Sequence, residues 1–242
     1  MNSQVQVSHE RSGAWAVDHA VRVLTTGCFE SRRATSEVGA VILEPASVVL
    51  RLTTPDVTAL PGWTAEQSGR AWRAPLQWLS TAPVNDRLPD PFPLLVSLGA
   101  TGDGRVLLNL ARADGMISLE GDDALAYGMA RSWSRRLTSA PWGSATRVVR
   151  VGFEPDPDFS GWDVSRLAEA APVLDAPDGG VLLFAGRPQG RDLYQVDRLL
   201  AEPVRRWSVV AVGAENAAWR FTLRLDGTVD TGLFAEPVHL RA

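Results

Sequence analysis

MISLEGDDALAYGMARSWSRRL, residues 116–137, is the stretch of sequence that decides the predicted fold. It opens with a short apolar run, 116–119, which is typical of a buried strand. Asp122 follows, and Asp is among the preferred N-cap residues because its carboxylate accepts a hydrogen bond from the first helical turn. Apolar side chains then recur every four residues, the spacing of one helical face, at Leu125, Met129, Trp133 and Leu137. The stretch therefore predicts a strand followed directly by a helix over 122–137.

The alternation of strand and helix continues toward the C-terminus. Apolar runs that predict strands lie at 147–153, 181–185 and 207–212, and helical patterns separate them at 164–170 and 193–204. Strands that alternate with helices are typical of a parallel sheet. We therefore expect an α/β core with a mostly parallel sheet and helices on both faces, closed by a hairpin over 219–233.

The N-terminal part of the chain has a different pattern. A helical face over 13–26 is followed by two β-branched runs around a turn that contains Pro45, which predicts a hairpin over 38–52. A cluster of prolines between 83 and 93 indicates a domain boundary. We expect three parts: a flexible tail over 1–12, a small N-terminal α+β module over 13–88, and the α/β core over 89–242.

Composition excludes several classes of chemistry. The 242 residues carry 24 basic and 28 acidic side chains, a net charge of −4, and every basic residue is Arg. Without Lys, the chain has neither a Schiff-base lysine nor the phosphate-binding lysine of a P-loop. One Cys and three His exclude a multi-Cys zinc site and disfavour a His-rich one. We therefore expect no cofactor and no bound metal.

The sequence shows no signal for export or membrane insertion. Its first ten residues are polar and lack the apolar run of a signal peptide. The longest apolar runs are about five residues, whereas a membrane span needs about 20. We expect a cytoplasmic protein that reaches a membrane only through a partner. The net negative charge and the lack of a recognised motif also make nucleic acid an unexpected partner.

Residues 94–234 resemble the ATPase core of the FtsK–HerA superfamily of P-loop proteins. The resemblance rests on an entry hairpin marked by Leu98, Gly99, Gly104, Asn109 and Leu110, and on the strand that follows it. Where that family has a glycine-rich loop ending in Lys, this chain has only Glu120, Gly121, Asp122 and Asp123. The strand at 181–186 also lacks the Walker B carboxylates. The resemblance thus implies a degenerate P-loop NTPase-like core, a pseudo-ATPase without nucleotide chemistry.

Residues 37–240 more closely resemble an uncharacterised segment of large actinobacterial proteins. Those proteins combine a LysM module with a bacterial transcriptional activator domain. The shared marks include Pro93 to Gly99, Leu119 to Asp122, Ser139 to Trp142 and Ala218 to Leu223. This chain shows neither of the two modules, so the resemblance implies neither peptidoglycan binding nor promoter binding.

Carboxylates occupy the segment 120–123, where the resemblance would place a phosphate. Asp122 suits the N-cap and Asp123 suits the positive end of the helix dipole, so the protein's own carboxylates would fill that anion site. Ligands of open α/β sheets bind at the carboxyl ends of the strands. Arg187 and Arg191, which follow the strand at 181–185, therefore form a candidate ligand edge with 120–123.

Charge is unevenly distributed along the core. Residues 131–150 carry five Arg and no acid, whereas residues 154–178 carry seven acids and one Arg. Two such faces suit charge-steered docking of protein partners. The candidate docking residues are Arg131, Arg135, Arg136, Trp142, Asp156, Asp158 and Trp162. The alternatives are an ordinary solvated surface and, for the acidic loop 154–163, a divalent-cation site.

These features together predict a non-catalytic scaffold or adaptor subunit of a larger assembly. A membrane-associated secretion machine, a pilus machine or a ring of ATPases is the expected kind of assembly. One alternative is a small-molecule or nucleotide sensor that binds without hydrolysis. A second alternative is a metal-dependent enzyme that uses the acidic loop 154–163.

Overall fold

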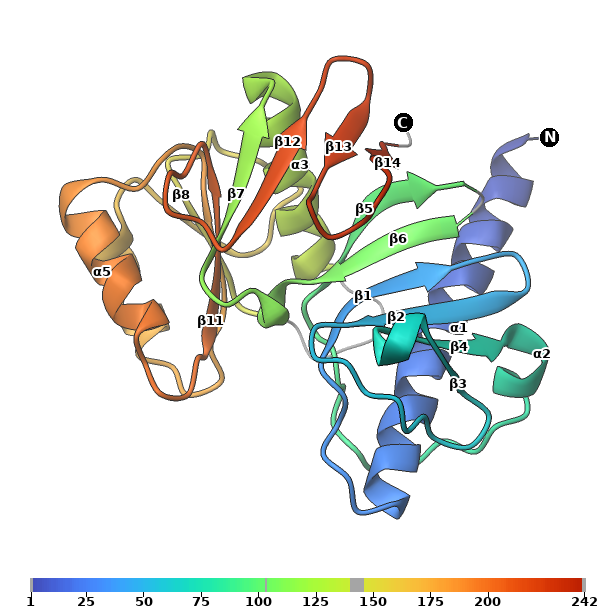
Figure 1. The fold of residues 1–242 in the computed structure, drawn as a ribbon. Coiled ribbons are helices and arrows are strands. Elements are labelled where there is room, and N and C mark those ends of the chain that lie inside the picture. The colour runs from blue at the N-terminus through green and yellow to red at the C-terminus, as the bar shows by residue number, and fades with distance from the viewer. Residues whose placement is uncertain (1, 103, 140–145, 241–242) are drawn as a thin grey trace. The chain divides into compact units, whose positions relative to one another are not determined.

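The computed structural model describes residues 2–102, 104–139 and 146–240, and the side chains of residues 2–12 are outside that description (Figure 1). The chain divides into two compact units. The first comprises Met1–Phe92 and Gly102–Arg112, and the second comprises Pro93–Thr101 and Ala113–Ala242. The change of unit at Phe92 lies within the proline-rich segment, four residues beyond the expected boundary after residue 88. Residues 102–112 then return to the first unit.

The first unit is an antiparallel sheet with one long helix. Its strands follow the order β3 (Thr64–Glu66), β4 (Ala71–Pro75), β2 (Ser47–Leu52), β1 (Val38–Leu43) and β6 (Gly104–Asn109). Each of these strands pairs with its neighbour in antiparallel fashion. The predicted 38–52 hairpin is confirmed as β1 and β2. Short helical turns are η1 (Gln67–Gly69), α2 (Leu76–Leu79) and η2 (Leu110–Arg112).

Helix α1 (Asn2–Glu30) packs against β1 and α2 of this unit. Residues 2–12 belong to this helix, where the sequence led us to expect a flexible tail. The helix contributes to the core through Val17, Ala20, Val21, Leu24 and Cys28, all buried. Among the described helices, including α1, none has the apolar length that crossing a bilayer requires.

The described residues of the second unit form nine strands in the order β5, β14, β13, β12, β7, β11, β10, β8, β9. In that order they span Leu95–Thr101, Val238–His239, Thr228–Asp230, Trp219–Leu223, Met116–Gly121, Trp207–Val212, Gly180–Phe184, Val148–Val151 and Trp162–Val164. The pairings from β5 to β12 are antiparallel, and those from β12 to β9 are parallel. The helices are α3 (Asp123–Thr138), α4 (Ala171–Leu174) and α5 (Gly190–Leu200), with the 3-10 turn η3 (Leu167–Ala170).

The predicted fold class, a mostly parallel sheet in a P-loop NTPase-like core, is wrong. Among the described residues, seven strand pairings within the two units are antiparallel and five are parallel. The fold is therefore mixed, mostly antiparallel and poor in helix. The helix expected over 164–170 is instead a strand end and η3, and α4 ends after four residues with Pro172 in its first turn. The predicted closing hairpin over 219–233 is confirmed as β12 and β13, which pair antiparallel. An apolar run indicates a strand but not its distant partners, so the antiparallel pairings of β1 with β6, of β13 with β14 and of β14 with β5 were not predicted.

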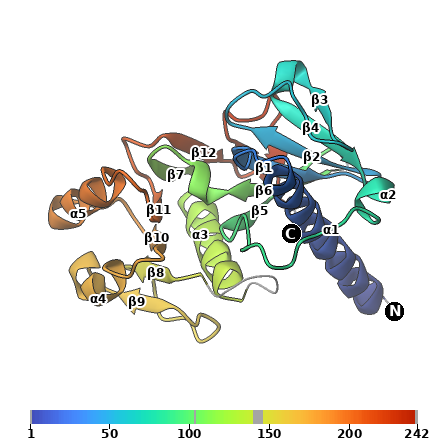
Figure 2. The same cartoon turned by 90° about the horizontal axis from the view of Figure 1, so that it is seen from below.

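The parallel strands present different chemistry on their two faces. Successive strand side chains point to opposite faces. Val149 and Val151 of β8 join a buried apolar cluster with Leu167, Leu174 and Val196. Arg150, between the two valines, points to the other face, which α3 covers (Figure 2). Arg150 is thus a charged side chain at a buried position of a strand whose other residues are all apolar.

Gly121 joins β7 to α3 at a backbone position that suits only glycine. Its φ is +96°, and a Cβ there would lie 2.1 Å from the carbonyl oxygen of Leu223 on β12. Gly121→Ala is therefore expected to lower the free energy of unfolding by more than about 1 kcal/mol, as measured by urea denaturation.

Gly128→Ala is the matched control for this prediction. Gly128 is an exposed residue inside α3, and a Cβ there would have no neighbouring atom within 4 Å. This substitution should raise the free energy of unfolding by about 0.5–1 kcal/mol, because Ala loses less conformational freedom than Gly in a helix. Equal effects of the two substitutions would contradict the close approach at Gly121.

Candidate functional site

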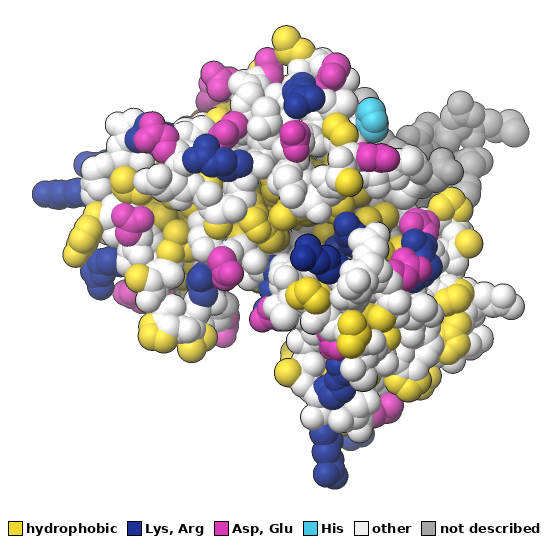
Figure 3. All heavy atoms as spheres, in the orientation of Figure 1, with side chains coloured by type: hydrophobic (Ala, Val, Ile, Leu, Met, Phe, Trp, Pro, Cys, Tyr) yellow, Lys and Arg dark blue, Asp and Glu magenta, His cyan; other side chains and the backbone are white. Residues whose placement is uncertain are grey.

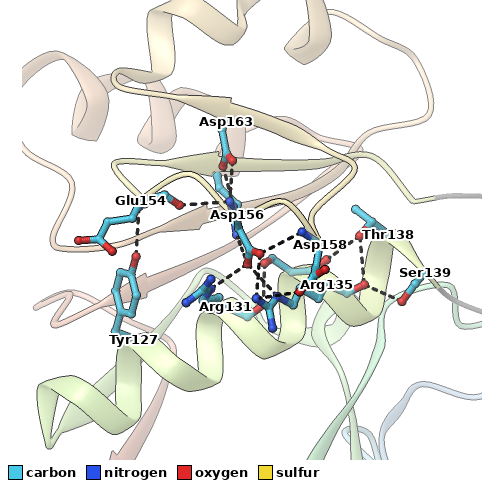
Figure 4. Close-up of polar contacts among 11 residues, drawn as sticks. Tyr127, Arg131, Arg135, Thr138, Ser139, Glu154, Asp156, Asp158 and Asp163 are labelled. Carbon is cyan, nitrogen blue, oxygen red and sulfur yellow. Dashed lines mark hydrogen bonds and ion pairs between the residues drawn. The ribbon is translucent and has the colours of Figure 1, made fainter.

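The candidate site gathers charged side chains from α3, β8, β9 and the loop 152–161 (Figure 4). At its centre lies the fully buried carboxylate of Asp156. Arg131 Nε and Arg135 Nε each donate to Asp156 Oδ2 at 2.7 Å, and Arg135 Nη2 donates to Oδ1 at 2.8 Å. Arg150 Nη1 donates to Oδ2 at 3.4 Å. The two α3 arginines reach the same carboxylate because residues four apart share one face of a helix.

Arg150 is the second centre of this cluster. Its side chain is fully buried, and it forms a bidentate pair with Asp163 of β9, with Nε to Oδ1 at 2.6 Å and Nη2 to Oδ2 at 2.5 Å. The guanidinium carbon lies 3.9 Å from the ring centroid of Phe159 and 5.3 Å from that of Phe153. Guanidinium groups are attracted to aromatic faces at such distances. The carboxylate of Asp163 and the two phenyl rings therefore interact with the Arg150 guanidinium in place of water.

The loop 152–161 is held by its own backbone as well as by the arginines. Asp158 N donates to Asp156 Oδ1 at 3.1 Å, and Phe159 N donates to the Asp156 carbonyl at 3.1 Å. Glu154 N donates to Tyr127 Oη of α3 at 3.1 Å. Asp residues favour such local turns because their side chains bond to the backbone two residues on. The loop is therefore ordered around Asp156.

The electrostatics of the cluster favour its charged forms. Hydrogen bonds from Arg135 and Arg131 hold the pKa of the Asp156 carboxyl far below its usual range. In return, the hydrogen bonds to Asp156 raise the pKa values of both arginines. Asp156 thus stays ionised throughout the physiological pH range, and a group that never changes its protonation state does not suit general acid–base catalysis.

The structure brings four of the predicted docking residues together, but mainly as partners of one another. Arg131, Arg135 and Asp156 share the contacts above, and Asp158 Oδ2 lies 3.5 Å from Arg135 Nη2. Arg136 is half-buried near the end of α3, and Trp142 lies outside the described residues. Trp162 is 43% exposed on β9. Of the docking residues that the structure describes, Trp162 and Asp158 therefore face solvent most openly.

The segment 120–123 forms a tight junction. Asp122 Oδ1 accepts a hydrogen bond from Leu125 N at 2.9 Å, which confirms the predicted N-cap. Only Asp122 separates the end of β7 from the start of α3. Glu120 pairs with Arg220 of β12 at 3.1 Å. A connection this short cannot curl its backbone amides around a phosphate, as a glycine-rich loop does.

The candidate ligand edge is partly closed by an internal ion pair. Arg187 donates through both Nη atoms to Glu215, and the contact from Nη2 to Oε2 is 2.6 Å. Arg191 is exposed in the first turn of α5 and makes no ion pair or hydrogen bond within the described ranges. The structure therefore leaves Arg191 available there, whereas Arg187 already has a carboxylate partner.

The acidic loop does not assemble a metal site in the described part of the chain. No group of three or more His, Cys, Asp or Glu side chains is placed there to hold a metal ion. The buried carboxylate of the loop, Asp156, faces guanidinium groups that occupy both of its oxygens. A metal ion would have to displace these guanidinium groups to use the oxygens of Asp156.

The predicted docking residues do not include Arg150 and Asp163, which complete the cluster. Asp163 was predicted only as part of the acidic loop 154–163, the alternative divalent-cation site, and Arg150 only as part of the basic stretch 131–150. The signal for Arg150 was present, because a lone Arg interrupts the apolar strand VVRV at 148–151. A cation in a strand predicted to be buried requires a carboxylate partner. The sequence could not identify that partner, since several acids follow within the next residues.

Comparison with known proteins adds little to this description. No family model matches the chain, and no curated protein sequence matches it. Among solved structures, the pCW3 conjugation coupling protein TcpA, in its monomer form with ATPγS, is weakly similar. The TM-score is 0.41 and the identity 10%, and the match covers 92% of this chain and 94% of that one. A likeness at this level supports no conclusion about function.

Removal of the central charge tests the cluster. Asp156→Asn should lower the free energy of unfolding at pH 7, because it leaves the arginines without their buried carboxylate. An acid with a lowered folded-state pKa stabilises the fold above its unfolded-state pKa and loses that contribution as pH falls. The difference in the free energy of unfolding between this variant and the unmodified protein should therefore become smaller below about pH 4. Urea denaturation between pH 7 and pH 3 measures this.

Asp158→Asn is the control, since Asp158 lies in the same loop but its side chain is 74% exposed. Its substitution should change stability little at any pH, because exposed ion pairs contribute little. If Asp158→Asn destabilised the protein as much as Asp156→Asn, the cluster would not be centred on Asp156.

Proposed function

We propose that this chain is a non-catalytic scaffold or adaptor that binds a protein partner through β9 and the loop 152–161. The observation that carries the proposal is that the charged side chains of this region form ion pairs with one another. The arginines and carboxylates that could have served catalysis or metal binding neutralise one another internally. The same contacts hold an exposed Trp162 in place at the end of the sheet.

Trp162 has the properties of an interface anchor. It lies on β9, the last strand in the order of the second unit, and it pairs with Val149 on one side only. The neighbouring Asp163 is fixed by Arg150, so the backbone that carries Trp162 is already ordered before any partner binds. Tryptophan is enriched among residues that dominate binding energy, and preorganisation lowers the entropic cost of association.

The exposed acids of the loop 152–161 favour a partner with a basic surface. Asp158 is largely exposed and Glu154 is also exposed, so their carboxylates give the rim of this surface a negative potential. Complementary charges on a partner would raise the rate of association and fix its orientation. The assembly that we expect is a membrane-associated secretion or pilus machine or a ring of ATPases, with any membrane recruitment supplied by the partner.

The absence of nucleotide chemistry is part of this proposal. The chain has no Lys, and the junction after β7 is a single residue. The purified full chain should therefore show no hydrolysis of ATP with Mg²⁺ above the buffer background in a phosphate-release assay. Turnover that survives rigorous purification and scales with protein concentration would overturn the non-catalytic assignment.

Substitution of Trp162 tests the docking surface. The tagged full chain is purified from its native host after nuclease treatment, and the stoichiometric protein partner is identified by mass spectrometry and then purified. Trp162→Ala should weaken the binding of that partner at least about tenfold in calorimetry, because hot-spot residues contribute about 2 kcal/mol or more.

Trp15→Ala is the matched control, since Trp15 is the same residue type and is 52% exposed on α1 in the first unit. It should leave the affinity unchanged. Recovery of the chain alone and monomeric, or an affinity that Trp162→Ala does not change, would remove the support for this surface.

A further inference from the structure

A small cavity lies beside α5, at the amino-terminal ends of β10 and β11. Its volume is about 240 Å³, and the residues that give it its chemistry are Leu174, Asp175, Gln195, Arg198, Glu202 and Arg206. These residues belong to the end of α4, to α5 and to the connection before β11. The cavity is thus separate from the Asp156 cluster and from the candidate ligand edge at the opposite ends of the same strands.

One wall of the cavity is a fixed, neutral ion pair. Arg206 Nε and Nη2 donate to the two carboxylate oxygens of Glu202, both at 3.0 Å, and Arg206 Nη1 donates to the Ala176 carbonyl at 3.1 Å. The hydrogen bonds from Arg206 lower the pKa of Glu202, and those to Glu202 raise the pKa of Arg206. Bidentate pairs of this kind have a defined geometry. The Glu202–Arg206 pair therefore limits the shape of the cavity on this side and contributes no net charge to it.

Two further charges on the cavity have no such partner. Within the described chain, the side chains of Arg198 and Asp175 make no hydrogen bond or ion pair. Arg198 contributes to the lowered pKa of Glu202, and Asp175 contributes to the raised pKa of Arg206, so each lies near the fixed pair. Basic, acidic and apolar side chains are interspersed over the α5 region (Figure 3). The cavity therefore offers one unpaired cation and one unpaired anion.

The remaining lining residues supply an unmet acceptor and an apolar surface. Gln195 lines the cavity, and its Oε1 is buried with no hydrogen-bond donor. A rotation that turns this oxygen toward a ligand would break no hydrogen bond at that atom. Leu174 is buried and Leu199 is half-buried, and both line the same space. A ligand with a short aliphatic part and a donor group would satisfy both features.

We propose that this cavity binds a small zwitterionic metabolite of the amino-acid type. Its carboxylate pairs with Arg198, its ammonium group pairs with Asp175, and its aliphatic part covers Leu174 and Leu199. A ligand that carries only negative charge would leave Asp175 unpaired and be repelled by it, and one that carries only positive charge would leave Arg198 unpaired and be repelled by it. The volume is below the roughly 300–1,000 Å³ of pockets for drug-sized molecules, so the ligand is small. This inference does not depend on the proposed scaffold function.

The test measures binding to the full chain by calorimetry and by thermal shift. The zwitterionic probes are L-leucine, 5-aminopentanoate and the dipeptide Ala-Leu, which differ in the spacing of their charges. The single-charge probes are 4-methylpentanoate and 3-methylbutylamine. At least one zwitterion is expected to bind saturably and to raise the melting temperature, whereas the single-charge probes should bind at least tenfold more weakly. If no zwitterion bound at about 10 mM, which is tenfold above a weak dissociation constant of about 1 mM, the proposal would be overturned.

Paired substitutions locate the site. Arg198→Gln and Asp175→Asn should each weaken the binding of the zwitterion at least tenfold, and neither should affect folding because both side chains are exposed. Arg191→Gln is the matched control, since Arg191 is an exposed, unpaired arginine of the same helix that does not line the cavity. It should leave the affinity unchanged within about twofold. A loss of binding in Arg191→Gln with no loss in Arg198→Gln would place the ligand at the other end of the strands and contradict the proposal.

Discussion

The need to solvate one buried guanidinium organises much of the second unit. Arg150 lies on β8 with no exposed surface, and an ionised group removed from water is costly unless it is paired and hydrogen-bonded. Asp163 supplies one partner and thereby keeps β9 beside β8. Asp156 supplies another, and it also accepts hydrogen bonds from α3, so the loop 152–161 must fold back over that helix. One residue thus links a strand, a loop and a helix.

Local signals in the sequence predicted elements well, and long-range signals were missing. Residues 116–137 form β7 and α3 as expected, with Asp122 as the cap, because apolar spacing and capping are properties of neighbouring residues. The hairpins of β1 with β2 and of β12 with β13 were also predicted, because a turn joins their strands directly. Distant strand partners leave no local signal, so the antiparallel pairings of β1 with β6 and of β14 with β5 were missed and the parallel share of the sheet was overestimated. For the same reason the charge asymmetry was visible in the sequence, but the pairing of Arg131 with Asp156 was not.

The charged residues of this chain serve the fold before they serve a partner. Arg187, Arg206 and Arg220 each pair with a carboxylate distant from the Asp156 cluster. A guanidinium that is fixed by a carboxylate of the same chain has fewer hydrogen-bond donors left for another molecule, so these three pairs act first on the fold. Two features outside these ion pairs support the proposals: the exposed Trp162 on one surface, and the unpaired Arg198 and Asp175 around a small cavity on another.

Neither unit is a continuous piece of chain, and this limits how the protein can be divided or recombined. The polypeptide leaves the first unit after Phe92, returns for Gly102–Arg112 and leaves again. A fragment that ended at Phe92 would lack β6 and expose the free edge of β1, whose sequence is the apolar run VGAVIL. Open apolar edge strands pair readily with other chains. A gene fusion or truncation that kept the first 92 residues alone would therefore produce an aggregating fragment, so the two units have to be inherited, expressed and folded together.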